Sequence, residues 1–175
     1  EDQKKTFLTV TVTIDAPIEK VWTMWNTPEH IIHWNAASDD WHTPFAENDV
    51  RQGGRFVSHM AARDGSMSFD FGGTYDHVKP YELITYTIDD GRKVDVTFVD
   101  QGNQTRVVEA FEAESINPIE MQQGGWQAIL DNFKKYAEGY GQLEKLHFET
   151  SILASKDKVY STMLDEKHYA EWTAE

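Results

Sequence analysis

The sequence predicts an α+β fold in which a six-stranded antiparallel sheet wraps around one long helix near the C-terminal end. Six runs of residues alternate apolar and polar side chains, which is typical of half-buried strands. Turn signals such as Asp64-Gly65 and Asp89-Asp90-Gly91 separate neighbouring runs and favour antiparallel hairpins. The last run is followed by residues 118–138, in which apolar residues recur at helical spacing.

The first elements expected are one strand and two short helices. Residues 7–15 alternate apolar and polar side chains, and Ala16-Pro17 ends this strand with a proline that suits the first turn of a helix. The apolar face of that helix consists of Ile18, Val21, Trp22 and Trp25. A second start signal, Thr27-Pro28-Glu29, opens a short helix that carries Ile31, Ile32 and Trp34.

Residues 36–49 are polar and predict a loop. Beyond this loop, five further strands are expected at residues 55–62, 66–79, 83–88, 93–99 and 105–113. Gly72-Gly73, within the second of these strands, indicates a bulge or a close approach of the backbone. Together with the first strand, these runs complete the six-stranded sheet.

The long helix has the clearest start signal. Asn117-Pro118-Ile119-Glu120 provides an N-cap residue, a proline at the first helical position and a glutamate that resembles a capping box. Gly139 and Gly141 are expected to end the helix. Gly124-Gly125 lowers helix propensity by roughly 1 kcal/mol per glycine against alanine. The pair favours a kink or tight packing on the sheet, and the alternative is room for a ligand.

Residues 8–36 recur without a gap 138 positions later. Eight residues are identical in the two copies: Leu8, Ile14, Ala16, Lys20, Val21, His30, Trp34 and Ala36 return as Leu146, Ile152, Ala154, Lys158, Val159, His168, Trp172 and Ala174. The repeat predicts a complete domain at residues 6–140 and a partial second copy at residues 144–175.

The partial copy is expected to open with a strand at residues 145–152, followed by short helices that carry Val159, Tyr160, Met163, Leu164 and Trp172. Its apolar residues would lack the sheet and long helix on which the first copy packs. We therefore expect it to be poorly ordered or loosely docked, and we expect a second domain to be completed beyond Glu175 in the parent protein.

Composition excludes several classes of partner. The net charge of −14 argues against nucleic acid or an anionic membrane, because the phosphate field would repel the protein. The absence of cysteine removes disulfides and thiolate chemistry, and fits a cytoplasmic location. No apolar run approaches the roughly 20 residues of a membrane helix.

Neither a metal nor a cofactor is expected. Of the seven histidines, only His30 and His33 lie at helical i, i+3 spacing, and no third ligand accompanies them. Gly-x-Ser-x-Gly, Walker and dinucleotide-binding motifs are absent. Gly53-Gly54 and Gly72-Gly73 lack the strand–loop–helix context of a phosphate-binding loop.

Four segments resemble a known family: APIEKVW at 16–22, PEH at 28–30 together with Trp34, DVRQGGRF at 49–56 and GWQAILDNF at 125–133. They are similar to the START-related SRPBCC superfamily, in the branch that is named after the activator of heat-shock protein 90 ATPase and is also called polyketide-cyclase-like. The resemblance covers residues 6–140. It implies the helix-grip fold of START and birch-allergen proteins, with a cavity between the sheet and the long helix.

Strand parity and helix spacing indicate which residues would line this cavity. The candidates are Phe56, Met60, Met67, Phe69, Phe71, Tyr75, Glu109, Phe111, Met121, Trp126, Ile129 and Phe133. As a lining, this set suits a flat apolar ligand with one or two polar groups. The alternative is that the same aromatic residues simply fill the interior as core.

Glu109 shares the parity of Phe111, which predicts a carboxylate on a buried face. It would then orient a ligand or act as a general base with a raised pKa. The alternative is a carboxylate at the rim of the cavity, paired with Arg51, Arg55 or Arg106. His59 has the opposite parity to Phe56 and is expected to face solvent.

Three functions remain, in decreasing order of support. The first is a non-catalytic carrier or sensor of a small hydrophobic or aromatic ligand. The second, implied by the resemblance, is a chaperone-associated module that stimulates the ATPase of heat-shock protein 90. The third is a polyketide cyclase or hydrolase with Glu109 or a cavity tyrosine as acid–base group. The sequence does not decide whether the protein is an enzyme, and it favours the non-catalytic functions. A fully packed interior would disfavour the first and third functions.

Overall fold

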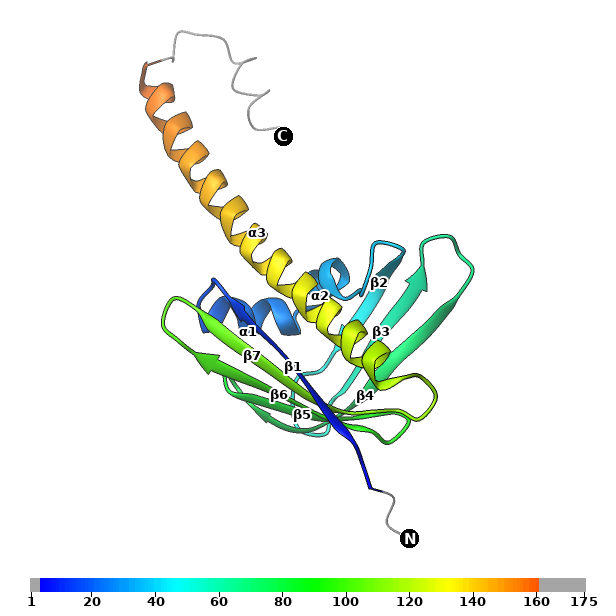
Figure 1. Cartoon of the computed structure of the whole chain (residues 1–175). Helices are drawn as coiled ribbons and strands as arrows, with labels where there is room; N and C mark the ends of the chain where they lie inside the picture. The colour runs from blue at the N-terminus through cyan, green and yellow to red at the C-terminus, as the bar shows by residue number, and fades with distance from the viewer. Residues whose placement is uncertain (1–3, 161–175) are drawn as a thin grey trace. The chain divides into compact units, whose positions relative to one another are not determined.

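The computed structural model describes the backbone of residues 4–160 and the side chains of residues 4–140, and it divides the chain into units 1–138 and 139–175. The elements are β1 (Phe7–Ile14), α1 (Ile18–Asn26), α2 (Pro28–Trp34), β2 (Trp41–Asn48), β3 (Arg55–Ala62), β4 (Ser68–Lys79), β5 (Leu83–Ile88), β6 (Lys93–Asp100), β7 (Thr105–Glu112) and α3 (Ile119–Tyr160). All strands of the described residues lie in the first unit, and α3 begins there (Figure 1).

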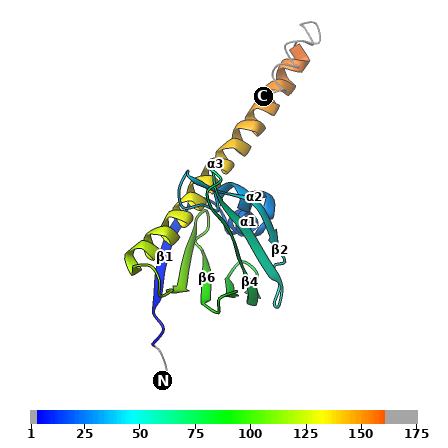
Figure 2. The same cartoon turned by 90° about the vertical axis from the view of Figure 1, so that its right-hand side faces the viewer.

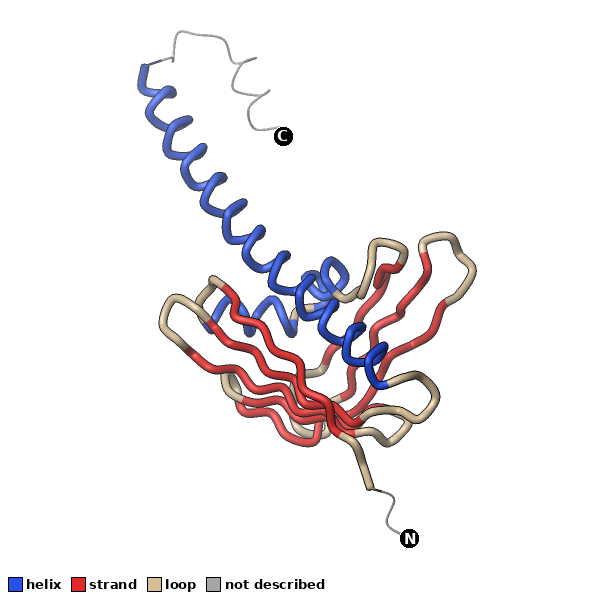
Figure 3. Tube along the Cα trace, viewed as in Figure 1, coloured by secondary structure: helices blue, strands red, loops and turns tan. Residues whose placement is uncertain are grey.

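The seven strands form one antiparallel sheet in the order β1-β7-β6-β5-β4-β3-β2. Every pair from β2 to β7 is sequential, and β1 joins the far side of β7. Figure 3 shows the strands curving around the first turns of α3. Figure 2 shows this arrangement turned by 90°. The helix-grip arrangement expected from the sequence is therefore confirmed, with one strand more.

Strand β2 is the additional one, in a segment predicted as a loop. It lies at the edge of the sheet and pairs only with β3. A register shift between His42 and Phe45 interrupts the pairing, so the buried residues Thr43 and Ala46 are three positions apart instead of two. This irregular edge strand lacks the alternation by which the other strands are recognised.

Helices α1 and α2 bury only part of the apolar residues predicted for them, since Trp22 and Trp25 are half-buried and Ile32 is exposed. Ile18, Val21 and Met24 of α1 and Ile31 and Trp34 of α2 are buried. The indole Nε1 of Trp34 donates a hydrogen bond of 3.0 Å to the main-chain oxygen of Met24. Because the buried indole is both packed and hydrogen-bonded, it fixes the angle between the two helices.

The open side of edge strand β1 is covered by α3. Three α3 side chains donate hydrogen bonds to alternate main-chain oxygens of β1: Gln123 Nε2 to Thr9 (3.2 Å), Gln127 Nε2 to Thr11 (3.1 Å) and Lys134 Nζ to Thr13. These carbonyls point away from β7, because successive residues of a strand direct them to opposite sides. The contacts hold α3 beside the sheet and satisfy groups that an unpaired edge would expose.

The predicted end of the long helix was wrong. Helix α3 continues past Gly139 and Gly141 to Tyr160, so the segment predicted as a strand at residues 145–152 is helical. A strand needs a neighbour for its backbone hydrogen bonds, whereas a helix makes them within itself. Val159 and Tyr160 belong to α3, while Met163, Leu164 and Trp172 lie outside the described residues. No described helix, α3 included, is long and apolar enough to cross a membrane.

We expect deletion of residues 142–175 to leave the melting temperature of the first unit nearly unchanged, because that compact unit ends at Glu138. From the partial repeat we also expect weaker amide-exchange protection in residues 144–175 than in residues 119–138. Equal protection in the two segments, or a drop of many degrees on deletion, would contradict this division of the chain. Thermal denaturation and exchange followed by mass spectrometry measure both quantities.

Candidate functional site

A cavity of about 420 Å³ lies within the first unit, between the concave face of the sheet and α3. Its volume falls in the range of small-molecule sites. Most of its lining is apolar, and it contains few charged side chains: Glu47, Arg92, Glu109 and Glu114. The interior is therefore not fully packed.

Nine of the twelve residues predicted to line a cavity do so: Phe56, Met60, Phe69, Phe71, Tyr75, Glu109, Met121, Trp126 and Ile129. The structure places the other three elsewhere. Met67 is 64% exposed and precedes β4, because the hairpin turn carries it out of the sheet. Phe111 and Phe133 are completely buried and pack behind the lining as core.

The two core residues support the lining directly. The ring of Phe111 stacks under Trp126, with ring centroids 4.1 Å apart and an angle of 6° between the planes. Phe133 packs edge-on against Trp25 and Trp34, with both pairs of centroids 4.9 Å apart. Strand parity and helix spacing identify the inward face correctly, but they do not distinguish a lining residue from one that lies beneath it.

Sequence reasoning missed several lining residues, among them Trp25, Trp34, Asn48, Tyr86 and Arg92. The alternation along residues 83–88 contained a signal for Tyr86, which shares a buried face with Ile84 and Ile88. Asn48 was hidden in the unrecognised strand β2, and Arg92 lies in a turn, where side-chain parity has no meaning. Trp25 and Trp34 were assigned to helix faces, but only the tertiary packing turns them toward the cavity.

Aromatic rings form one wall of the cavity. Phe56 contacts three other rings, with centroid distances of 4.9 Å to Tyr86, 5.2 Å to Tyr75 and 6.0 Å to Phe71. A Cβ atom on Gly73 would lie 2.9 Å from the Phe56 ring and 2.4 Å from the main-chain oxygen of Thr87. The predicted close approach at Gly72-Gly73 is thus present, and it lets the Phe56 ring lie over the strand.

Glu109 projects from β7 into the cavity and is 4% exposed. Burial raises the pKa of its carboxyl to about 8, and no contact with another described residue offsets that effect. The carboxyl is therefore mostly protonated at neutral pH. The predicted pairing at the rim was wrong, because the three arginines contact other groups: Arg51 binds Asp49, Arg55 binds Asp89 and Arg106 binds Thr11.

Two tyrosines also line the cavity, and burial disfavours the ionisation of both. Burial raises the pKa of Tyr86 well above its ordinary value, and the charge of Glu109 adds to the effect. Burial also raises the pKa of Tyr75, whose hydroxyl donates a hydrogen bond to Asn48 Oδ1. Asn48 Nδ2 in turn donates to the main-chain oxygen of Asn26 (2.8 Å), which fixes the position of Tyr75.

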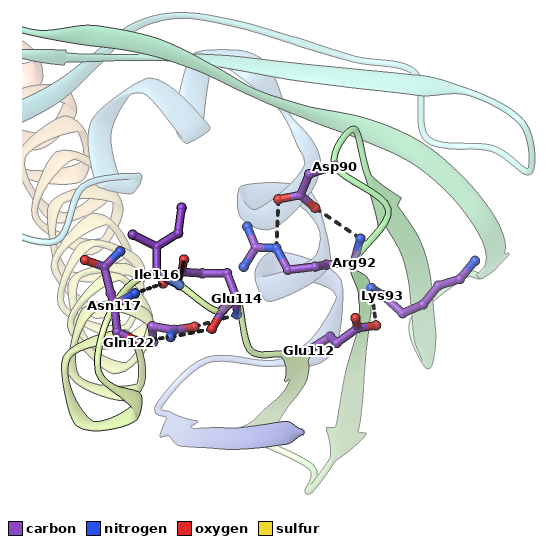
Figure 4. A network of polar contacts seen from close by, with 8 residues as sticks. All are labelled: Asp90, Arg92, Lys93, Glu112, Glu114, Ile116, Asn117 and Gln122. Carbon is purple, nitrogen blue, oxygen red and sulfur yellow. Dashed lines mark hydrogen bonds and ion pairs between the residues drawn. The ribbon is translucent and has the colours of Figure 1, made fainter. Parts of the chain in front are cut away.

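A polar network closes one side of the cavity at the start of α3 (Figure 4). The carboxylate of Glu114 accepts hydrogen bonds of 2.8 Å from the main-chain nitrogens of Ile116 and Asn117, which lowers its pKa. Gln122 bonds the main chain at Glu114 and Asn117. Across the cavity, Arg92 Nε donates to Asp90 at 2.8 Å. The bonds of Glu114 and Gln122 order the loop between β7 and α3, whereas the bond of Arg92 lies in the turn between β5 and β6.

Gly125 lines the cavity, and a Cβ atom placed on it or on Gly124 would meet nothing within 4 Å. The tight packing favoured from the sequence is therefore absent at both glycines. At Gly125 the missing side chain leaves space in the cavity, as in the alternative interpretation. His59, as predicted, lies on the outer face and contacts Asp70, with 2.7 Å between Nδ1 and Oδ1.

The chain was compared with known proteins. The family model described as "Activator of Hsp90 ATPase homolog 1-like protein" matches residues 15–138. The solution structure of an AHSA1-like protein from Aeromonas hydrophila is 47% identical, with a TM-score of 0.71, and the match covers 77% of this chain and 94% of that one. A solution structure from Cytophaga hutchinsonii is 57% identical, with a TM-score of 0.66 and coverage of 77% and 93%.

More distant structures share the fold alone. A crystal structure from Nitrosomonas europaea has a TM-score of 0.67 at 15% identity, over 78% of this chain and 96% of that one. No curated protein matches the chain.

Proposed function

The chain belongs to the family of activator of Hsp90 ATPase homolog 1-like proteins, and from this premise we propose that its first unit is a non-catalytic carrier or sensor of a small hydrophobic or aromatic ligand. The observation that carries the proposal is the cavity of about 420 Å³ between the sheet and α3. An apolar lining with few polar groups is the usual composition of a small-molecule site.

The lining supports both affinity and orientation. A ligand that buries about 250 Å² of apolar surface would gain on the order of 6 kcal/mol, part of which the loss of translational and rotational freedom offsets. The carboxyl of Glu109, protonated at neutral pH, is able to donate one hydrogen bond at the floor of the cavity.

We expect titration with flat apolar compounds to change the tryptophan fluorescence and to raise the melting temperature. Trp25, Trp34 and Trp126 line the cavity, so a bound ligand alters their surroundings directly. At a ligand concentration of 100 times Kd, the free energy of unfolding should rise by about 2.7 kcal/mol. If a broad panel of lipids, flavonoids and aromatic polyketides changes neither quantity at high micromolar concentration, the proposal fails.

Two neighbouring glycines provide a matched pair of variants. Gly125→Leu should fill part of the cavity and weaken ligand binding at least tenfold, because its side chain enters the space that the ligand needs. Gly124→Leu should leave binding unchanged, since Gly124 is exposed and does not line the cavity. Both variants should stabilise α3 by roughly 1 kcal/mol through helix propensity, so a loss of binding confined to Gly125→Leu cannot arise from unfolding.

The family supports a second candidate, a module that stimulates the ATPase of a chaperone of the Hsp90 class. The measurement is the ATPase rate of purified Hsp90 with and without this protein. The same glycine variants relate the two candidates: stimulation that survives Gly125→Leu would be independent of the cavity. Stimulation together with no ligand binding by the panel would replace the first proposal by the second.

A further inference from the structure

We propose that the cavity takes a hydrophobic cation, an amphiphilic amine or quaternary ammonium compound whose positive charge lies against Glu109. The inference rests on the proposed binding function and specifies the chemical class of the ligand. Three features of the first unit carry it: a buried acidic group to which the described side chains offer no partner, an aromatic enclosure, and an excess of negative charge.

Glu109 is the first feature. Its neighbours across the sheet are Val10 on β1 and Val96 on β6, whose apolar side chains cannot donate a hydrogen bond to the carboxyl. Its side chain is buried and lines the cavity. Buried polar groups in folded proteins nearly always have partners. A partner supplied by the ligand would remove the penalty that Glu109 otherwise imposes on the fold.

The aromatic enclosure is the second feature. Rings of Trp25, Trp34, Phe56, Phe71, Tyr86 and Trp126 line the same cavity. The face of an aromatic ring attracts a cation, and enclosures of several rings select quaternary ammonium groups. A carboxyl among such rings provides the countercharge, and the rings replace the water that the cation loses.

The charge distribution is the third feature. Arg92 is the only cationic side chain in the described lining, and its Nε is bound to Asp90. Glu47 on β2 and Glu114 before α3 add negative charge to the lining, and the whole chain carries −14. The titratable groups around Glu109 are thus Tyr75, Tyr86, Arg92, Glu47 and Glu114, while α1, α2 and α3 contribute no charged lining residue. The resulting field favours a cation over an anion.

A cation beside Glu109 must bind with release of the carboxyl proton wherever that group is protonated. Because burial raises the pKa of Glu109 to about 8, the affinity for a permanent cation should fall as the pH drops below 8. The fall should approach tenfold per pH unit when binding requires the ionised carboxylate. A neutral ligand that accepts a hydrogen bond from Glu109 should show the opposite trend, losing affinity as the pH rises above 8.

The experiment uses two probes of nearly equal shape, benzyltrimethylammonium and its neutral carbon analogue neopentylbenzene, with 4-phenylbutyrate as the anion. The affinity of the full chain for each of the three compounds is measured by tryptophan fluorescence at pH 6 and pH 9. We expect the cation to bind at least about tenfold more tightly than its neutral analogue at pH 9, and to lose at least about tenfold in affinity at pH 6. Binding of the neutral analogue should show much less dependence on pH.

Glu109→Gln should remove both the preference for the cation and its pH dependence. The matched control is Glu112→Gln, a carboxylate on the same strand that does not line the cavity, and it should retain both. A Glu109→Gln variant that still prefers the cation would overturn the proposal.

The outcomes separate this inference from the proposed function. Equal affinity for the cation and its neutral analogue at both pH values overturns the proposal that the ligand is a cation. The proposed carrier function would then still stand. Tightest binding of the anion also overturns it and assigns the polar end of the ligand to Arg92. Failure of all three probes, together with failure of the apolar panel, overturns both proposals.

Discussion

Glu109→Gln should remove a strong loss of stability that the wild-type protein suffers as the pH rises. The carboxyl of Glu109 has an ordinary pKa of 4.5, and burial raises it to about 8 in the folded protein. The folded state therefore holds a proton that the unfolded chain releases between these values, so stability falls as the pH rises through that window. Its contribution is fully present below pH 4.5 and is lost above about pH 8.

The size of this effect follows from the same two values. The difference in unfolding free energy between wild type and Glu109→Gln should change by on the order of 5 kcal/mol between pH 4 and pH 9, in favour of the variant at the higher pH. Urea denaturation at several pH values measures it, and Glu112→Gln, which removes a carboxylate that contacts Lys5, controls for the lost charge. Parallel pH profiles for wild type and Glu109→Gln would show that the carboxyl is solvated or paired in the folded protein.

Phe133→Ala should destabilise the protein by about 3–5 kcal/mol, the usual cost of removing a completely buried aromatic ring. The ring joins α3 to the tryptophans of α1 and α2, and its loss leaves a hole between three elements. Chemical denaturation measures the change. A loss below about 1 kcal/mol would mean that the helices close over the hole or that the ring is not buried in solution.

Trp126→Ala provides the comparison on the same helix. If Trp126 were fully buried, as the sequence alone suggests, its replacement by alanine would lower the free energy of unfolding roughly as much as that of Phe133. In the structure Trp126 is only partly buried and borders the cavity. We therefore expect a smaller loss of about 1–2 kcal/mol, arising mainly from its stacking on Phe111. Trp126→Ala should also weaken ligand binding, because Trp126 lines the cavity. Phe133→Ala should reduce stability without removing a side chain from the lining.

Much of the fold was decided by patterns that lie within short stretches of the chain. The alternation of β3 to β7, the start of α1 after Pro17 and the start of α3 after Pro118 each depend on neighbours a few residues away. The same local rules placed Glu109 on the inward face of β7, since the parity of a strand is independent of what lies opposite. These features were predictable because the chemistry that determines them is written in adjacent residues.

Tertiary structure decided what depends on partners distant in the sequence. Strand β2 has no alternation of its own and becomes a strand because β3 offers hydrogen bonds to it. Segment 145–152 aligns with β1 in the proposed repeat, with Leu146 and Ile152 as its identical positions, and it is nevertheless helical. A strand pattern is realised only beside a neighbouring strand. Strand parity likewise assigned both Phe111 and Phe56 to the inward face. It did not show that Phe111 belongs to the core and that Phe56 faces the cavity.

The sequence by itself thus determined the class of fold, the inward faces and the candidate acidic group. Only the tertiary structure decided that a space remains between the sheet and α3, that Arg51, Arg55 and Arg106 contact other groups, and that the pKa of Glu109 is raised. The physical reason is that desolvation and cavity volume are properties of the surroundings on every side. No stretch of adjacent residues encodes them.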